Sequence, residues 1–485
     1  MKLKDLLAGV AVLEATANME QEIPMVHYDS RKVTDNSLFV AVAGFTTDGN
    51  KYIPMAMEKG AAAVVTAKKP QGNVPYVLVE NDRLALAQIG ANFFDHPVGK
   101  FTLIGVTGTN GKTSVTLLLK HILEQACHAK VGLIGTMENL IGDEVIPTQR
   151  TTPESFDLQA LYSQMQKKGC THVVMEVSSH AIALDRVGGV TFDVAAFTNL
   201  TEDHLDFHKT MENYCATKAV LFERCKKAVL NQDDTWFSTI LPHVNCPMIT
   251  TSVEGKADIT AQDISLQAEG VAFTAVHNGE KAQVQLPIPG RFTVHNALTA
   301  LGIAVQLGIS LEDAAHALKT AKGVRGRVEV VPTPNTPYSV LIDYAHTPDG
   351  LENVLRSVRD FCKGRLIAVF GCGGDRDPMK RPVMGKIGTE LSNFAVITSD
   401  NPRTEDPMAI IGDILKGVRC DKKEYIVIEN RRQAIAYALD IGKKDDIIVL
   451  AGKGHETYQE ICGVKHHLDE REVVYQHLTK QNSGT

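Results

Sequence analysis

Short runs of apolar residues, separated by polar loops rich in glycine and aspartate, recur along the first part of the chain. They lie at residues 38–42, 62–65, 101–106, 173–175 and 194–197. Runs that are apolar throughout are typical of parallel strands covered on both faces. A helical pattern follows the third run at residues 114–125. The alternation of strands with helices predicts a doubly wound α/β sheet.

The same pattern returns nearer the C-terminus, where candidate strands lie at residues 340–342, 366–370, 394–398 and 447–451. A polar loop follows each of them, and ligands bind at the carboxyl ends of strands in open α/β sheets. The chain has 485 residues, which are too many for one core. We therefore predict three α/β domains, at 1–99, 100–326 and 327–485, with a hinge at 95–97.

Charge and cysteine content narrow the possible partners and compartments. The 57 acidic residues outnumber the 50 basic ones, and the formal charge of −7 argues against a nucleic-acid binder. The nine cysteines are odd in number and include no CxxC pair, so neither a disulfide framework nor a cysteine zinc site is expected. We find no signal-peptide pattern and no apolar stretch of about 20 residues. A cytoplasmic protein without a membrane span is expected.

A glycine-rich loop, GTNGKTS at residues 108–114, stands between a predicted strand and a predicted helix. Glycines allow backbone N–H groups to close around phosphate oxygens, and the start of a helix favours anions. Lys112 would reach the outer phosphates of a bound ligand, and the Thr113 hydroxyl would hold Mg²⁺. The general phosphate loop has a further glycine where this chain has Val106, so the match is to a shortened variant. A glycine-rich turn before a helix is the alternative.

Two polar loops follow the strands at 173–175 and 194–197. Glu176 in the first loop is a natural Mg²⁺ ligand, and His204 in the second could complete such a site. Ordinary loop polarity is the competing interpretation. In the C-terminal region, Asp343 and His346 could approach a nucleotide, although the same loop could also serve as a helix start at Thr347-Pro348.

Taken in order, these motifs resemble those of the Mur ligases over nearly the whole chain. The resemblance rests on Asp29-Ser30-Arg31, GTNGKTS at 108–114, Thr151-Thr152-Pro153, EVSSH at 176–180, TNLTEDHLDFH at 198–208, Tyr214 with Lys218 and Leu221-Phe222, DYAHTPD at 343–349, GCGGDRD at 371–377, DNPR at 400–403 and GKGHE at 452–456. It implies an N-terminal domain that binds a UDP-linked precursor, a central ATPase domain and a Rossmann-like C-terminal domain.

The resemblance also implies binding roles for individual residues. Ser30 should contact the uridine-diphosphate part of the precursor. The muramoyl-dipeptide arm should be held by Thr151, Thr152, Ser178 and Arg186. ATP should be bound by Gly108, Thr109, Asn110, Gly111, Lys112, Thr113 and Ser114, and by Asn296, Arg327, Asp343 and His346.

Lys218 matches a lysine that is carbamylated in this family, and the resemblance therefore implies a modified side chain. Carbamylation replaces an ammonium with an anionic, oxygen-rich group, which should bind Mg²⁺ together with Thr113, Glu176 and His204. Lys112, Lys218, Glu176 and His204 are the expected catalytic residues.

The implied reaction is ATP-dependent ligation of meso-diaminopimelate to the D-glutamate of UDP-N-acetylmuramoyl-L-alanyl-D-glutamate, through an acyl phosphate, in peptidoglycan precursor synthesis. Diaminopimelate should be bound by Arg376, Asp400, Asn401, Pro402, Arg403, Gly452 and Glu456. A guanidinium such as that of Arg403 can bind the distal carboxylate bidentately. The Glu456 carboxylate suits the distal ammonium.

Other functions stay open at this point. An L-lysine-adding relative usually lacks the arginine at position 403. A folylpolyglutamate-synthase-like ligase shares the ATPase chemistry, but neither the N-terminal domain nor DNPR is expected there. A nucleotide-gated scaffold would explain the phosphate loop but not the metal-ligand candidates. Departures from the family pattern at Leu184 and Gly44-Phe45-Thr46 leave the precursor contacts there undefined. A monomer is expected.

Overall fold

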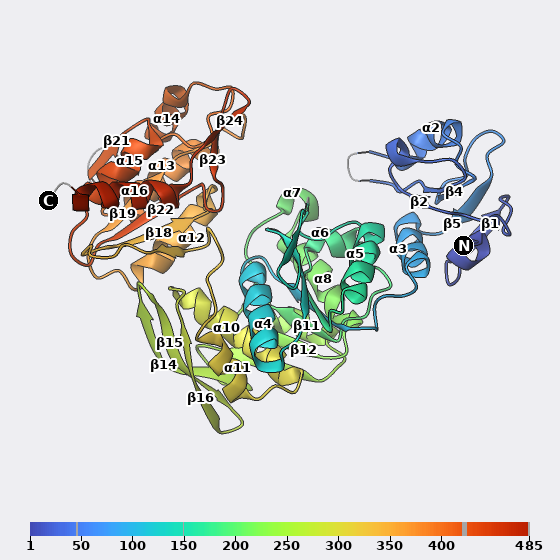
Figure 1. Ribbon diagram of the computed structural model, residues 1–485, viewed down its shortest axis with the longest axis horizontal. Helices are drawn as coiled ribbons and strands as arrows, with labels where there is room; N and C mark the ends of the chain where they lie inside the picture. The colour runs from blue at the N-terminus through green and yellow to red at the C-terminus, as the bar shows by residue number, and fades with distance from the viewer. Residues whose placement is uncertain (45–46, 149, 420–423, 484–485) are drawn as a thin grey trace. The chain divides into compact units, whose positions relative to one another are not determined.

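A computed structural model describes residues 1–44, 47–148, 150–419 and 424–483 of the chain (Figure 1). The chain forms two compact units: Met1–Thr260 with Ala297–Ala314 (unit 1), and Ala261–Asn296 with Ala315–Thr485 (unit 2). Strands and helices alternate in both units, which confirms the predicted α/β class. The finer division into three domains at 99/100 and 326/327 stays a prediction.

The N-terminal part of unit 1 contains a small sheet with the strand order β1-β5-β4-β3-β2. Its elements are α1 (Leu3–Leu6), β1 (Val12–Ala15), β2 (Val26–His27), η1 (Ser30–Lys32), β3 (Leu38–Val40), η2 (Gly49–Tyr52), α2 (Ile53–Glu58), β4 (Ala63–Thr66), β5 (Tyr76–Val79) and α3 (Asp82–Phe93). Val40 and Val65 pack in the core that contains α1 and α3, whereas Phe39 and Val64 face a second core that contains α2. Both faces are therefore covered, which explains the continuous apolar runs.

A larger sheet follows in unit 1, with the order β13-β12-β11-β6-β10-β7-β8-β9 over the strands that lie in this unit. Its strands are β6 (Thr102–Thr107), β7 (Val131–Ile134), β8 (Asn139–Ile141), β9 (Glu144–Ile146), β10 (His172–Glu176), β11 (Val194–Phe197), β12 (Ala228–Asn231) and β13 (Met248–Ser252). The helical elements are α4 (Lys112–Cys127), α5 (Ser155–Lys167), α6 (Ser179–Ala183), α7 (Leu205–His208), α8 (Met211–Ala219), η3 (Val220–Arg224), α9 (Phe237–Ile240) and η4 (Leu241–His243). The expected strands at 101–106, 173–175 and 194–197 are confirmed.

The register of this sheet places the predicted motifs together. Strand β6 lies between β10 and β11 and runs parallel to both, with Val106 paired with Glu176 and Thr107 paired with Phe197. The loops that leave the carboxyl ends of these strands therefore start at one edge of the sheet. Asp95 and His96, at the predicted hinge between α3 and β6, adopt positive φ angles of 58° and 46°.

Five elements carry the chain across the boundary of the units or lie in unit 2 ahead of its main sheet. They are β14 (Ile259–Gln267), the antiparallel pair β15 (Gly270–His277) and β16 (Glu280–Leu286), α10 (Arg291–Gln306) and α11 (Leu311–Leu318).

The main sheet of unit 2 has the order β17-β18-β22-β19-β20-β21, and only β17 runs antiparallel to its neighbour. The elements are β17 (Glu329–Val331), β18 (Ser339–Asp343), α12 (Pro348–Arg359), β19 (Leu366–Phe370), α13 (Lys380–Leu391), β20 (Phe394–Ile397), α14 (Pro407–Leu415), β21 (Glu424–Val427), α15 (Arg431–Asp440), β22 (Ile447–Ala451), β23 (Tyr458–Ile461), β24 (Val464–His467) and α16 (Glu470–Ser483). Alternate residues along the strands face two cores, one under α12, α13 and α14 and the other under α15 and α16. Three layers result, as expected for a Rossmann-like arrangement.

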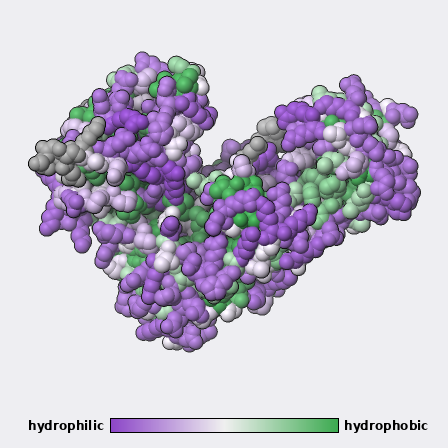
Figure 2. All heavy atoms as spheres, in the orientation of Figure 1, coloured by the Kyte–Doolittle hydropathy of each residue, from purple (hydrophilic) through white to green (hydrophobic). Residues whose placement is uncertain are grey.

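The face of the molecule drawn in Figure 2 is mostly hydrophilic, in keeping with a charged fraction of 22%. Among the described helices, none is both long enough and apolar enough to cross a membrane.

Candidate active site

The phosphate loop links β6 to α4 and requires glycine at two positions. Gly108 has a φ of 148°, and a Cβ there would lie 1.9 Å from Thr198 Oγ1. Gly111 has a φ of 84° and precedes the first residue of α4. Thr198 Oγ1 donates to Asn110 O at 2.6 Å, which ties the loop to the segment after β11. The helix starts at Lys112, two residues earlier than predicted.

Lys112 lies across its own loop. Its Nζ donates to Gly108 O at 2.9 Å and to Thr109 O at 2.8 Å. The ammonium thus stands beside the backbone that precedes a helix N-terminus, where the helix dipole also favours an anion. This arrangement can neutralise a phosphate group held by the loop.

Glu176 ends β10 and is buried, with 1% of its surface exposed. Its Oε1 accepts from Thr113 Oγ1 and from Thr136 N, both at 2.9 Å, and its Oε2 accepts from Thr136 Oγ1 at 3.0 Å. The Thr113 hydroxyl and the Glu176 carboxylate are hard oxygen donors, so this pair fits the chemistry of Mg²⁺. Thr136 was missed from the sequence; its position just after β7, the parallel neighbour of β10, is the signal that could have indicated it.

Lys218 lies on α8 and is 1% exposed. Its Nζ donates to Gly108 O at 3.0 Å and lies 4.5 Å from the centre of the Tyr214 ring. Burial, and secondly the nearby charge of Lys112, hold the pKa of the Lys218 amine well below its usual value. A lysine with a low pKa is available as a neutral nucleophile, and this is the form that can add to CO₂. Leu221 and Phe222 are buried after it in η3.

His204 precedes α7 with a positive φ of 55° and is about half exposed. Its ring lies 4.9 Å from the ring of His180 and 6.2 Å from that of Tyr214. The Tyr214 hydroxyl lies 3.2 Å from Thr109 Oγ1, and burial raises the pKa of this phenol to about 12. The structure therefore brings Glu176 to Thr113, and Lys218 to Lys112, while His204 lies beside Tyr214.

In the parts of the chain that the structure describes, no three His, Cys, Asp or Glu side chains gather as a metal site. The Mg²⁺ ligands predicted from the sequence do not form a group of this type, because they include the Thr113 hydroxyl and a modified Lys218. The assignment of His204 and Lys218 as metal ligands stays a prediction.

The residues predicted to hold the muramoyl-dipeptide arm lie next to Glu176. Thr152 Oγ1 donates to Glu176 O at 2.9 Å and accepts from Ser178 N at 3.2 Å, and Thr151 Oγ1 lies 3.0 Å from Thr136 Oγ1. Arg186 Nη1 donates to Thr152 O at 3.2 Å. These four predicted residues are thus brought together. Ser30 is buried in η1, among the elements of the N-terminal sheet.

Glu154, which no sequence motif indicated, forms ion pairs with three arginines. Its carboxylate lies 2.6 Å from Arg150 Nη1, 2.8 Å from Arg186 Nε and 3.4 Å from Arg83 Nη1. Arg83 comes from α3, so the cluster links the two sheets of unit 1. At Leu184, the backbone carbonyl accepts from Arg83 at 3.2 Å. Phe45 and Thr46 lie outside the described residues.

In unit 2, the DNPR segment follows β20 and meets the GKGHE segment that follows β22. Asn401 Nδ2 donates to Glu456 Oε2 at 3.0 Å. A Cβ on Gly452, which has a φ of 117°, would lie 2.5 Å from Asp400 Oδ2. A Cβ on Gly374 would lie 1.9 Å from Pro402 O, so any side chain at position 374 would clash with the DNPR segment. Arg376 is exposed on the adjoining loop.

Arg403 has a φ of 52°, a conformation that non-glycine residues adopt only rarely. Its Nη1 donates to Gly374 O at 2.7 Å, and its Nε lies 3.4 Å from a Glu460 carboxylate oxygen. The guanidinium is therefore held along one side. Strained backbone of this kind is concentrated at ligand sites.

Asp343 ends β18 and is buried. It accepts from Val328 N and Ala345 N, both at 2.8 Å, and burial raises the pKa of its carboxyl above the usual value. The Arg327 guanidinium lies 5.4 Å from the centre of the Tyr344 ring, and the ring centres of His346 and His455 lie 4.6 and 4.8 Å from it. The predicted nucleotide contacts Arg327, Asp343 and His346 therefore gather around Tyr344. Asn296 is buried in α10.

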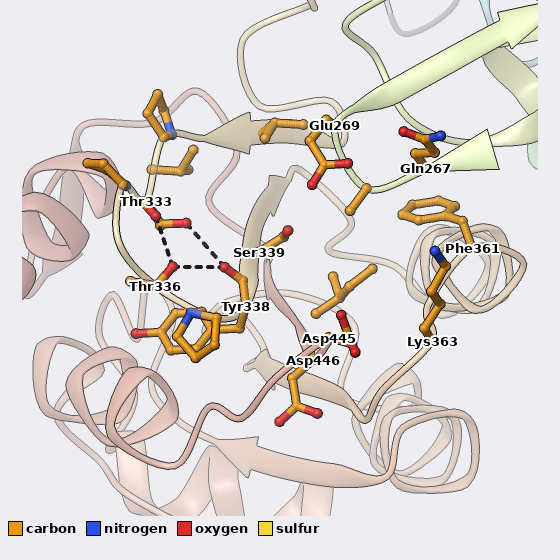
Figure 3. Close-up of a pocket in the computed structure, with 17 residues that line it drawn as sticks. Gln267, Glu269, Thr333, Thr336, Tyr338, Ser339, Phe361, Lys363, Asp445 and Asp446 are labelled. Atoms are coloured by element: carbon orange, nitrogen blue, oxygen red, sulfur yellow. Dashed lines mark hydrogen bonds between the residues drawn. The ribbon is translucent and has the colours of Figure 1, made fainter. Parts of the chain in front are cut away.

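A cavity of about 560 Å³ opens elsewhere in unit 2 (Figure 3). Ser339, Ile447 and Asp446 line it at the amino ends of β18 and β22, together with Tyr338 and Phe361. None of the site residues predicted from the sequence lines this cavity. Ligands in open α/β sheets bind at the opposite, carboxyl ends of the strands, where Asp343 and Gly452 lie.

Comparison with known proteins supports the family resemblance that the sequence motifs indicate. Family profiles described as "Mur ligase family, catalytic domain", "Mur ligase middle domain" and "Mur ligase, glutamate ligase domain" match residues 22–94, 106–304 and 326–454. A protein of Clostridium tetani named UDP-N-acetylmuramoyl-L-alanyl-D-glutamate–2,6-diaminopimelate ligase is 48% identical over 480 residues, which cover 98% of each chain.

Solved structures give a consistent result. One titled as a UDP-N-acetylmuramoyl-L-alanyl-D-glutamate–2,6-diaminopimelate ligase superposes with a TM-score of 0.76 at 30% identity and covers 99% of both chains. A folylpolyglutamate synthase of Mycobacterium tuberculosis reaches a TM-score of 0.62 at 17% identity, over 83% of this chain and 95% of its own. This second likeness concerns the fold alone.

Proposed function

The chain belongs to the Mur ligase family, and from that premise we propose that it joins meso-diaminopimelate to the D-glutamate of UDP-N-acetylmuramoyl-L-alanyl-D-glutamate at the expense of ATP. The observation that carries the choice of amino acid is that Arg403 and the Asn401–Glu456 pair lie on the two loops that leave the carboxyl ends of β20 and β22, and that Glu460, which pairs with Arg403, also donates its backbone N–H to Asn401. One site thus offers a cation for a distal carboxylate and an anion for a distal ammonium.

The reaction has two steps. An oxygen of the D-glutamate carboxylate attacks the γ-phosphorus of ATP, the bond to the ADP oxygen breaks, and an acyl phosphate forms. The amine nitrogen of diaminopimelate then attacks the acyl carbon, the C–O bond breaks, and phosphate and a proton leave. The protein has little covalent chemistry to do, so positioning and charge neutralisation supply the catalysis.

Each cluster of unit 1 has a part in this scheme. Lys112 and the start of α4 neutralise the charge that spreads over the transferring oxygens. Thr113 and Glu176 would hold Mg²⁺, which supplies further charge neutralisation, with His204 and the carbamate of Lys218 as the remaining ligands. Thr151, Thr152, Ser178 and Arg186 orient the precursor arm toward this region.

The two enzyme alternatives differ in what the amino-acid site must bind. L-Lysine has no distal carboxylate and would leave Arg403, which is 21% exposed, without a ligand partner. A folylpolyglutamate synthase would not need the DNPR–GKGHE pairing. We further propose that the enzyme is a monomer and acts in the cytoplasm. The free thiols of its described cysteines fit a reducing compartment.

Purified protein, ATP, Mg²⁺ and UDP-N-acetylmuramoyl-dipeptide, supplied with a panel of amino acids, test the proposal. We expect phosphate release that requires both the precursor and meso-diaminopimelate, with a tripeptide-linked product found by mass spectrometry. Equal or better use of L-lysine would refute the choice of amino acid. ATP hydrolysis that ignores the precursor would refute the ligase assignment.

A further inference from the structure

Lys453, the second residue of the GKGHE segment, is fully buried at 0% exposure. Its Nζ donates to Asn401 Oδ1 at 2.7 Å and to Glu456 Oε2 at 2.8 Å, while Asn401 Nδ2 donates to the same Glu456 oxygen at 3.0 Å. The three side chains therefore form a closed triangle that joins the loop after β20 to the loop after β22. Asn401 Oδ1 also accepts from Glu460 N at 2.9 Å, which extends the triangle to β23.

The triangle fixes which oxygen of Glu456 can meet a ligand. Two donors occupy Oε2, whereas Oε1 has no hydrogen-bond partner among the described residues. A carboxylate has room for several donors, so Oε1 is the oxygen left for an incoming ammonium. Lys453 thus sets the orientation of Glu456 without itself being accessible to a ligand.

Lys453 also balances charge. It pairs with Glu456, while Arg403 pairs with Glu460 at 3.4 Å, so these two ion pairs carry no net charge between them. Diaminopimelate has two carboxylates and two ammonium groups and is neutral overall near pH 7, whereas L-lysine carries a net charge of +1. A neutral site favours the neutral amino acid, and removal of the Lys453 charge would favour a cation.

We propose that Lys453 is a positioning residue that orients Glu456 for the distal ammonium and keeps the amino-acid site neutral, so that a neutral diamino diacid is preferred over a cationic diamino acid with a single carboxylate. This inference rests on the proposed function, because it takes Glu456 to bind that ammonium. It assigns a role to a residue that contacts only other protein groups.

The test compares Lys453→Met with Lys465→Met. Both lysines lie over the ring of Tyr458, with Nζ at 5.3 and 4.1 Å from its centre, but Lys465 is exposed. We expect Lys453→Met to raise KM for meso-diaminopimelate at least about tenfold, with kcat changed less than about threefold and KM for ATP unchanged. The kcat/KM ratio of meso-diaminopimelate to L-lysine should fall. Lys465→Met should match the wild type in all of these constants.

Loss of kcat without a change in KM, or an unchanged ratio of the two amino acids, would overturn the inference. Should Lys453→Met fail to fold, the inference is tested by comparing the single variant Glu456→Gln with the double variant that carries both Glu456→Gln and Lys453→Met. If Lys453 acts through Glu456, the second change should raise KM for diaminopimelate by less than about twofold over the first; a further tenfold rise would contradict the mechanism. If the wild-type enzyme does not use diaminopimelate, the proposed function itself is refuted. If the wild type uses diaminopimelate and Lys453→Met is equally active, only the inference about Lys453 is refuted.

Discussion

Replacement of Arg403 by alanine is the sharpest test of how the enzyme chooses its amino acid. The change removes the only group of the DNPR segment that can form two parallel bonds to a carboxylate. Gly374 O and Glu460 hold the guanidinium along Nη1 and Nε, so it is already oriented before a ligand arrives. Substrate binding therefore loses a pre-organised partner, and diaminopimelate use should suffer more than L-lysine use.

The structure sets the size of the effect. Truncating one partner of a buried charge pair costs about 2–5 kcal/mol. The Arg403 side chain is 21% exposed and already shares one ion pair, so the lower part of that range, about 2–3 kcal/mol, applies. This corresponds to a loss of about 30- to 150-fold in kcat/KM for meso-diaminopimelate. L-Lysine makes no contact with the lost group, so its kcat/KM should change less than about threefold.

Phosphate release at saturating ATP and UDP-N-acetylmuramoyl-dipeptide gives kcat/KM for both amino acids. Arg356→Ala is the matched control, because this arginine is exposed on α12 and, among the described residues, pairs only with Glu352 one helical turn away. An equal loss for both amino acids would mean that Arg403 is structural. Unimpaired use of diaminopimelate by the folded variant would refute the assignment of its carboxylate partner.

Three further changes probe unit 1. Lys112→Ala should lower kcat at least about 100-fold at an unchanged melting temperature, because it removes the cation beside the phosphate loop; near-normal turnover would refute the phosphate-loop assignment. Lys218→Ala should be almost inactive and should regain part of its activity with millimolar acetate or formate, which supply the carboxylate that a carbamate would provide; full activity without rescue would contradict the carbamate. Burial lowers the pKa of His172 at the start of β10, so the unfolded chain takes up its proton first and the stability that this residue contributes is lost as pH falls below about 6.5. The melting temperature should therefore fall more between about pH 7.5 and about pH 5 for the wild type than for His172→Gln. An equal fall in the two proteins would show that His172 is not responsible.

The fold was largely predictable, since its strands are apolar throughout and each ends in a recognisable loop. The expected strand at 194–197 coincides with β11, for example. For the candidate site, the sequence singles out residues whose motif carries its own chemistry, such as Lys112 and Glu176, and their roles stay predictions. Thr136 and Glu154 were missed because their importance arises from pairing: Thr136 meets Glu176 from a neighbouring strand, and Glu154 meets an arginine 71 residues earlier in the chain.

Lys453 shows a different limit of sequence reasoning. Its motif was recognised, but the lysine within it was passed over, since nothing in the order of residues indicates that its side chain points inward. Burial of an ammonium becomes visible only when its partners, Asn401 and Glu456, are in place. The left-handed backbone of Arg403 is likewise a property of the fold and not of the motif.

Gly108 bears on how this enzyme could be inhibited. Any side chain there would run into Thr198 at 1.9 Å and would also meet the backbone of Asn199 at 3.0 Å, and its φ of 148° disfavours other residues even without those neighbours. The carbonyl of the same residue accepts from both Lys112 and Lys218. A compound that binds through the backbone of Gly108 would therefore contact a surface that point mutation can scarcely alter, and resistance would have to arise elsewhere among the residues that the compound contacts.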